Sequence, residues 1–135
     1  MRFSSDKGSS AVEFALLAPV FLLLVFGMTA YAIYFGTAHY IQQITADAAR
    51  ASIAGLDDLE REDIVRRYVS GSAQGYFLDP DRLTYKAEED GSDPDKFVVQ
   101  VRYDATALPI WNLYPPIPMP SKIIVAAATI RKGGR

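Results

Sequence analysis

The chain has 135 residues, half of them hydrophobic, and a formal net charge of −2 at neutral pH. It contains no cysteine, which excludes disulfide bonds and thiolate metal sites. Residues 9–130 hold nine basic and fifteen acidic residues, and this acidic balance argues against nucleic-acid binding.

An uncharged segment of 22 residues, from Phe14 to Phe35, dominates the N-terminal part of the chain. As a helix rising roughly 1.5 Å per residue it spans about 33 Å, close to the thickness of a bilayer's hydrocarbon core. Because no side of this helix is polar, it is typical of a membrane span and not of a water-soluble helix. Arg2 and Lys7 precede it, which favours a cytoplasmic N-terminus and places everything after about residue 40 across the membrane.

A glycine and a carboxylate flank the start of this segment. Gly8 follows a short basic leader, and Glu13 lies five residues later, at the threshold of the apolar run. A charged side chain in such a segment is costly and is normally retained for a purpose. If the chain is cut after Gly8, the new α-amino group of Ser9 is largely cationic and can pair with Glu13 of a neighbouring subunit. The alternative is a glutamate that merely faces lipid headgroups.

A secretory signal peptide is a competing interpretation of the same segment. Residues 30–32 (AYA) form an A-x-A-like triplet, and the apolar stretch before them has signal-peptide length. However, Glu13 stands where a basic residue is expected, and Ile33 continues the apolar run past the cut. We therefore favour a helix that is retained in the mature protein.

The helix is expected to continue beyond the membrane. No proline occurs between Gly36 and Ala54, and apolar residues recur there every three to four positions. We predict one helix from Ser9 to Ala54, about 69 Å long. Pro19 removes one backbone hydrogen bond and is expected to bend the helix, and Gly55 is a stop signal.

The remaining part of the chain, about 80 residues, is enough for one small domain with a modest core. Asp57 and Glu60 form a capping-box pattern, which predicts an amphipathic helix ending between Gly71 and Gly75. Its predicted apolar stripe consists of Ile64, Val65, Tyr68 and Val69. Strands are predicted at residues 82–87, 97–103 and 122–130. The simplest arrangement is α+β, with a three-stranded antiparallel sheet packed against both helices.

Two further segments invite a functional interpretation. Residues 88–95 are acidic, but their spacing does not fit a calcium-binding EF-hand loop, and we interpret them as a solvated hairpin loop. Residues 109–120 hold five prolines together with Trp111 and Tyr114, so they cannot form a regular helix or a central strand. We interpret them as a rigid connection to the last strand. The alternative is a contact surface, centred on Trp111 and Tyr114, for the membrane or a partner subunit.

Groups that could support catalysis are scarce. His39 is the only histidine and falls near the membrane exit of the long helix, so a histidine-based triad has no convincing place to assemble. Ser72 comes one position too early for a G-x-S-x-G nucleophile elbow, and no cluster has metal-ligand spacing. We expect no enzymatic activity, no metal and no cofactor, and a chain that is itself the substrate of an enzyme.

The stretch GSSAVEFALLAPVFLLLVFGMTAYAIYF, residues 8–35, resembles the N-terminal signature of the TadE-like family. Members of this family are pseudopilins, or minor pilins, of bacterial tight-adherence (Tad, Flp-type) pili. The resemblance implies cleavage by a prepilin peptidase between Gly8 and Ser9. It also implies roles in processing and assembly for Glu13, which becomes the fifth residue of the mature chain, and for the adjoining Phe14.

The resemblance divides the chain into three expected parts. Residues 1–8 form a cleaved leader, residues 9–54 a long helix with its transmembrane part at about 14–36, and residues 55–135 a periplasmic domain. Family members often carry an acidic residue near the far end of the apolar run. Residues 34–36 read YFG here, so a role of that acidic residue does not transfer.

The expected function is that of a minor pilin that contributes to pilus biogenesis, adhesion and surface attachment. Its expected partners are other pilin and pseudopilin subunits, the prepilin peptidase and the inner-membrane assembly platform, with no nucleic acid. The expected location is the bacterial inner membrane, in a single pass, with incorporation into an extracellular pilus left open. The alternatives are an uncleaved membrane-anchored periplasmic adaptor of the secretion machine and a periplasmic binding domain exported by a signal peptide.

Overall fold

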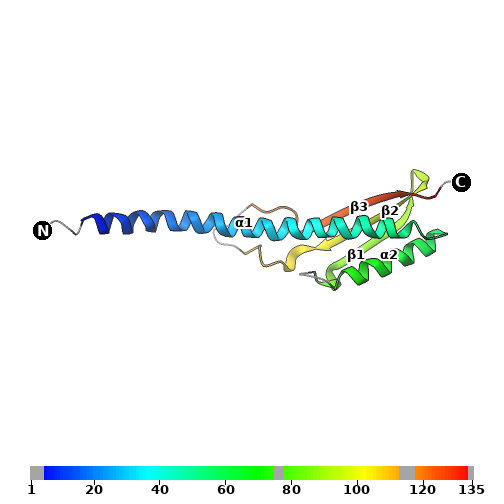
Figure 1. The fold of residues 1–135 in the computed structure, drawn as a ribbon, viewed down its shortest axis with the longest axis horizontal. Coiled ribbons are helices and arrows are strands. Elements are labelled where there is room, and N and C mark those ends of the chain that lie inside the picture. Colours follow the sequence, from blue (N-terminus) through cyan, green and yellow to red (C-terminus); the bar gives the residue numbers. More distant parts are fainter. Residues whose placement is uncertain (1–4, 75–77, 113–117, 134–135) are drawn as a thin grey trace.

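The long N-terminal helix is the central element of the fold. The computed structural model describes residues 5–74, 78–112 and 118–133. Helix α1 (Ser5–Ser52) continues through Pro19 without interruption, and its N-terminal half projects away from the rest of the chain (Figure 1). It begins inside the predicted leader, four residues before Ser9, and ends two residues before Ala54.

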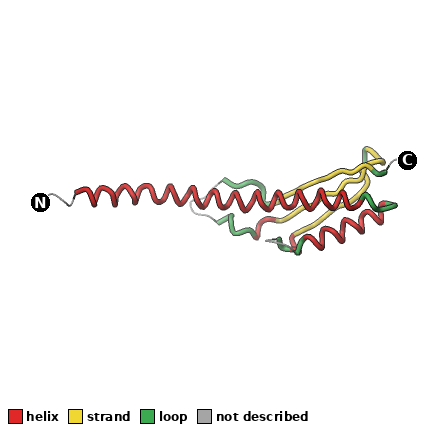
Figure 2. Tube along the Cα trace, in the orientation of Figure 1, coloured by secondary structure: helices red, strands yellow, loops and turns green. Residues whose placement is uncertain are grey.

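The remaining elements form a small domain around the distal half of α1. They are α2 (Asp58–Ser72), β1 (Leu83–Asp90), β2 (Asp93–Asp104) and β3 (Ile123–Arg131). The strands form an antiparallel sheet of order β1-β2-β3. Helix α1 packs against β2 and β3, while α2 packs against α1 and β1, so the helices form one layer and the sheet the other (Figure 2). The predicted α+β fold class is confirmed.

The hydrophobic core lies between α1 and one face of the sheet. Alternate residues of β2 are fully buried there, as the sequence predicted: Phe97, Val99, Val101 and Tyr103. Helix α1 contributes Ile41, Ile44, Ala48 and Ala49 from the opposite side. Because burying a side chain the size of valine or phenylalanine is worth roughly 1.5–3 kcal/mol, this contact is the main source of the domain's stability.

The acidic hairpin is tighter than predicted. Residues 88–95 were expected to form a loop, but β1 extends to Asp90 and β2 begins at Asp93. The carboxylate of Asp90 accepts hydrogen bonds from the backbone N–H and the hydroxyl of Ser92, at 3.0 and 2.8 Å. These bonds close the turn over Gly91 and Ser92, which allows the flanking residues to pair as strands.

The buried side of α2 is also shifted from the prediction. Its buried residues are Arg61, Val65 and Val69, whereas Tyr68, which was expected inside, is 36% exposed. Arg61 can be buried because its guanidinium is paired with Asp58, with Nη1 2.9 Å from Oδ1.

The start of α2 carries the predicted cap. The side chain of Asp57 accepts a hydrogen bond from the backbone N–H of Glu60 at 2.8 Å. The carboxylate of Glu60 accepts in return from the N–H of Leu56 at 2.8 Å, one residue earlier than in the usual capping box. The turn between α1 and α2 is therefore fixed by two reciprocal bonds.

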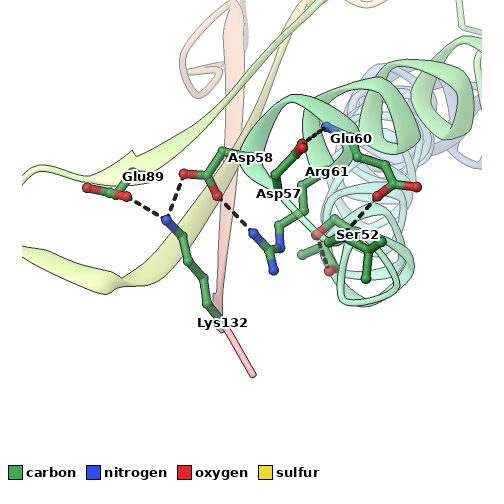
Figure 3. A network of polar contacts seen from close by, with 9 residues as sticks. Ser52, Asp57, Asp58, Glu60, Arg61, Glu89 and Lys132 are labelled. Carbon is green, nitrogen blue, oxygen red and sulfur yellow. Dashed lines mark hydrogen bonds and ion pairs between the residues drawn. The ribbon is translucent and has the colours of Figure 1, made fainter. Parts of the chain in front are cut away.

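A polar network joins the C-terminal end of the sheet to the start of α2 (Figure 3). Lys132 places its ammonium nitrogen 2.7 Å from Asp58 Oδ2 and 2.5 Å from Glu89 Oε2. The hydrogen bond from Lys132, followed by the one from Arg61, holds the pKa of the Asp58 carboxyl below its ordinary value. The same bonds to Asp58 and Glu89 raise the pKa of Lys132.

The close contact between Gly55 and Arg61 makes a prediction about stability. A Cβ added at Gly55 would lie 2.6 Å from Arg61 Cγ and 2.9 Å from its backbone nitrogen. We expect Gly55→Ala to lower the free energy of unfolding by about 1–3 kcal/mol, as overpacking does. Thermal unfolding of the full chain in detergent, followed by circular dichroism, measures this. Gly71→Ala is the matched control: its Cβ meets nothing within 4 Å, and in a helix it should stabilise by about 0.5–1 kcal/mol.

The Lys132 network predicts a pH dependence. Because the pKa of folded Asp58 is lowered, its contribution is present at neutral pH and is lost as the pH falls from the ordinary carboxyl range through the folded pKa. Because the pKa of Lys132 is raised, its contribution is lost only as the pH rises through that raised value. Lys132→Met should therefore lower the melting temperature at neutral pH. The difference in melting temperature between this variant and the unsubstituted chain should disappear in acid. Lys86→Met, at an exposed pair with Glu88, is the control and should change little. A gap that stays constant down to about pH 3 would contradict the assignment.

Candidate functional site

The N-terminal half of α1 is a bare apolar surface. Large hydrophobic side chains are exposed all round it: Val12, Phe14, Leu16, Leu17, Val20, Phe21, Leu22, Leu24, Val25, Phe26 and Met28. Within the described ranges, α1 is the one helix whose length and composition suit a membrane crossing. A surface of this extent requires an apolar environment, which a bilayer or neighbouring helices can supply.

The predicted processing site lies at the exposed start of this surface. Gly8 and Ser9 are helical and exposed, and a side chain added at Gly8 would meet no atom within 4 Å. Ser9 and Glu13 are four residues apart, so they lie on the same face of the helix. Within the described part of the chain, the side chain of Glu13 has neither a hydrogen-bond nor an ion-pair partner. Phe14 is 74% exposed. The arrangement leaves both the Gly8–Ser9 bond and the Glu13 carboxylate open to other molecules.

Two tyrosines stand where the bare half of α1 meets the domain. The Tyr34 hydroxyl donates to the carbonyl of Ser121 at 2.7 Å, and the Tyr31 hydroxyl donates to the carbonyl of Pro118. In the sequence, Tyr31 was noted only within the apolar run and its A-x-A-like triplet, and Tyr34 only at the far end of that run. The signal that could have identified them is a hydroxyl-bearing aromatic residue near the end of that run, because a buried tyrosine hydroxyl needs a partner.

Trp111 lies at the same junction. Its indole N–H donates to the carbonyl of Ala105 at 2.7 Å, and its ring meets Tyr34 edge to face with 6.2 Å between centroids. The Lys122 ammonium lies 5.7 Å from the centre of the Trp111 ring. Tyr114, the other residue of the predicted contact surface, lies outside the described residues. The structure therefore brings the described residues on both sides of 113–117 onto α1 near Tyr34.

An apolar pocket of about 360 Å³ lies beside α1 near the end of α2. It is lined by Ala32, Ile33, Gly36, Thr37, His39, Tyr40, Gln43 and Leu78. The polar groups in this wall are one imidazole, two hydroxyls and one amide, with no carboxylate or thiol to complete a nucleophile–base pair. No group of three or more His, Asp or Glu side chains in the described ranges could hold a metal ion.

The carboxylates of the acidic hairpin are occupied by their own turn. The backbone N–H of Ser92 bonds to Asp90 and lowers the pKa of that carboxyl. The backbone N–H of Asp95 does the same for Asp93, at 3.1 Å. These bonds explain the local structure of the turn without a cation.

Comparison with known proteins identifies the N-terminal third of the chain. Residues 8–50 match the family model described as TadE-like protein, so the resemblance expected from the sequence is confirmed. The matched region begins at Gly8 and covers both the bare half of α1 and most of its packed half. No curated protein and no solved structure matches the chain.

Proposed function

We propose that this chain, with a TadE-like segment at residues 8–50, is a minor pilin-like subunit of a Tad (Flp-type) pilus. It is inserted with its N-terminus in the cytoplasm and its domain on the periplasmic side of the inner membrane. A prepilin peptidase trims it after Gly8, and assembly then draws it from the membrane into contact with other pilin-like subunits. It contributes in this way to pilus biogenesis and adhesion, as a substrate of an enzyme and not as an enzyme.

The observation that carries this proposal is the division of α1 into two halves. The distal half fills the core of the domain, whereas the N-terminal half, which holds Gly8 and Glu13, is bare on all sides. A helix that only anchored the domain would not need a carboxylate at the start of its apolar run. If the N-terminal half of α1 first lies in lipid and later packs against neighbouring subunits, that half requires such an exposed apolar surface along its whole length.

The charge pair gives this packing a direction. Apolar contacts between helices are undirected, whereas the ammonium that cleavage creates at Ser9 can pair with one carboxylate. Glu13 has no partner within the described part of its own chain, so the carboxylate is available to a neighbouring subunit. Because Ser9 and Glu13 are four residues apart, each chain presents its ammonium and its carboxylate on the same side of α1.

The first prediction from this proposal concerns cleavage. Gly8→Val should block maturation, because a peptidase must bring the scissile backbone close to its catalytic groups and glycine presents no side chain in the way. The structure offers open space at Gly8, so the variant should fold normally and accumulate uncut in the membrane. N-terminal sequencing of the purified chain is the measurement.

The same measurement separates the competing functions. The unsubstituted chain should begin at Ser9, whereas an uncleaved adaptor would begin at Met1 and a signal-peptide product at Ile33. Gly36→Val, also at a helical glycine with open space, is the control and should be trimmed normally. If Gly8→Val still yields a chain beginning at Ser9, the assigned site is wrong.

The second prediction separates assembly from cleavage. Glu13→Gln keeps the size of the side chain but removes its charge, and loss of one partner of a buried ion pair costs about 3–5 kcal/mol. Insertion should survive and cleavage should fall only partly, while co-purification with pilin-like subunits and fibre-dependent adhesion should drop sharply. Glu13→Asp keeps the charge and should restore part of the co-purification and part of the adhesion. Normal co-purification and adhesion in Glu13→Gln would leave Glu13 as a residue that only faces headgroups.

A further inference from the structure

The junction between α1 and the domain has the composition of a membrane interface. We define the proline-rich limbs as residues 108–112 and 118–122, which flank residues that the structure does not describe. Figure 1 shows the limbs beside α1, at the end of the domain nearest its bare half. Trp111 and Lys122 lie on them, and Tyr31 and Tyr34 face them from α1. Tryptophan, tyrosine and lysine are the residues that gather at the headgroup level of a bilayer.

Distance along α1 places the limbs at the edge of a bilayer. The uncharged run begins at Phe14. Going along the helix from there, Ala30 is the first residue that is buried, with 2% of its surface exposed. At 1.5 Å per residue, Ala30 lies about 24 Å and Tyr34 about 30 Å along the helix from Phe14. The hydrocarbon core of a bilayer is about 30 Å thick. When Phe14 is at one boundary of that core, Tyr34 and the ring of Trp111 packed on it are therefore at the other.

The limbs have the hydrogen bonding that such a position requires. The adjoining hydrocarbon core holds no water, so a backbone group at its boundary is costly unless it has a partner within the protein or can reach the hydrated headgroups. The carbonyls of Pro118 and Ser121 accept from the two tyrosines, and the N–H of Ile110 donates to the carbonyl of Leu108 at 2.8 Å. Prolines add no N–H that would need a partner. If the limbs lay in water, their carbonyls could accept hydrogen bonds from water and would not need the hydroxyl groups of the two tyrosines.

We propose that the proline-rich limbs sit in the headgroup region of the leaflet on the domain's side, with Trp111 as the anchor. The lipid interface is the occupant because this surface is continuous with the bare half of α1, which the proposed function places in the bilayer. The Lys122 ammonium, held over the Trp111 ring, extends to lipid phosphate. The domain thus rests directly on the membrane and sets how deeply Glu13 lies at the other end of the span.

Trp111 is the single tryptophan of the chain, so its fluorescence tests the proposal directly. The full chain is reconstituted into phosphatidylcholine vesicles whose acyl chains are brominated either near the headgroup or near the chain end. We expect bromine near the headgroup to quench Trp111 about twofold, as suits an indole at the interface, and bromine near the chain end to quench it much less. Soluble acrylamide should quench it only weakly.

Two control tryptophans, introduced one at a time into a Trp111→Phe variant, calibrate the fluorescence quenching. Leu24→Trp lies about 15 Å from Phe14 along the helix, near mid-bilayer, and should be quenched most by bromine near the chain end. Val125→Trp, on the exposed outer face of β3, should be quenched by acrylamide and by neither lipid.

The outcomes separate this inference from the proposed function. If Leu24→Trp is quenched as expected but Trp111, like Val125→Trp, is quenched by acrylamide and by neither lipid, the membrane span is supported. The placement of the proline-rich limbs in the headgroup region is then wrong. If Trp111 is shielded from both lipid bromine and acrylamide, protein covers it and the lipid assignment is wrong. If Leu24→Trp is not quenched by either lipid, the membrane span itself fails and this inference falls with it.

Discussion

The packing of the distal half of α1 against the sheet is the interaction on which the rest of the structure depends. Ile41, Ile44 and Ala48 cover the buried face of β2, and α2 then closes the side next to β1. The apolar face of the sheet must be buried against another element, and the distal half of α1 provides that cover. Because α1 is one unbroken helix, fixing its distal half in the domain also fixes the direction in which the bare half projects (Figure 1).

One helix thereby serves two environments, and its residues change character where the environments meet. No charged residue occurs between Glu13 and Asp47, so the change is made with hydroxyl and amide groups. Tyr31 and Tyr34 lie at the transition and use their hydroxyls to hold the proline-rich limbs. The apolar bodies of these tyrosines suit lipid while their tips bind backbone carbonyls, which is the ordinary use of tyrosine at such a boundary.

The far end of the domain is held by charge. Lys132 follows the last strand and pairs with Asp58 at the start of α2 and with Glu89 near the end of β1. Its side chain is only 17% exposed, so the pairs are better shielded from solvent than most ion pairs on the domain surface. The ion pairs of Lys132 in this way tie α2, the first element of the domain, to the end of β3, the last element. They lie at the end of the domain opposite the proposed membrane surface.

The sequence by itself determined the features that depend on local pattern. The apolar run, the Gly8 to Glu13 spacing, the end of α1 shortly before Gly55 and the alternation along β2 are visible in the sequence, because their periods and motifs span only a few residues. The family match at residues 8–50 covers the same local signals.

Only the tertiary structure decided the contacts between distant residues. Tyr34 bonds to a carbonyl 87 residues away, and Lys132 to a carboxylate 74 residues away. The pairing of Arg61 with Asp58 is local, but the burial of Arg61, against the usual preference of arginine, was decided only by the tertiary structure. No periodicity encodes such pairings, because they depend on which faces meet after the chain has folded.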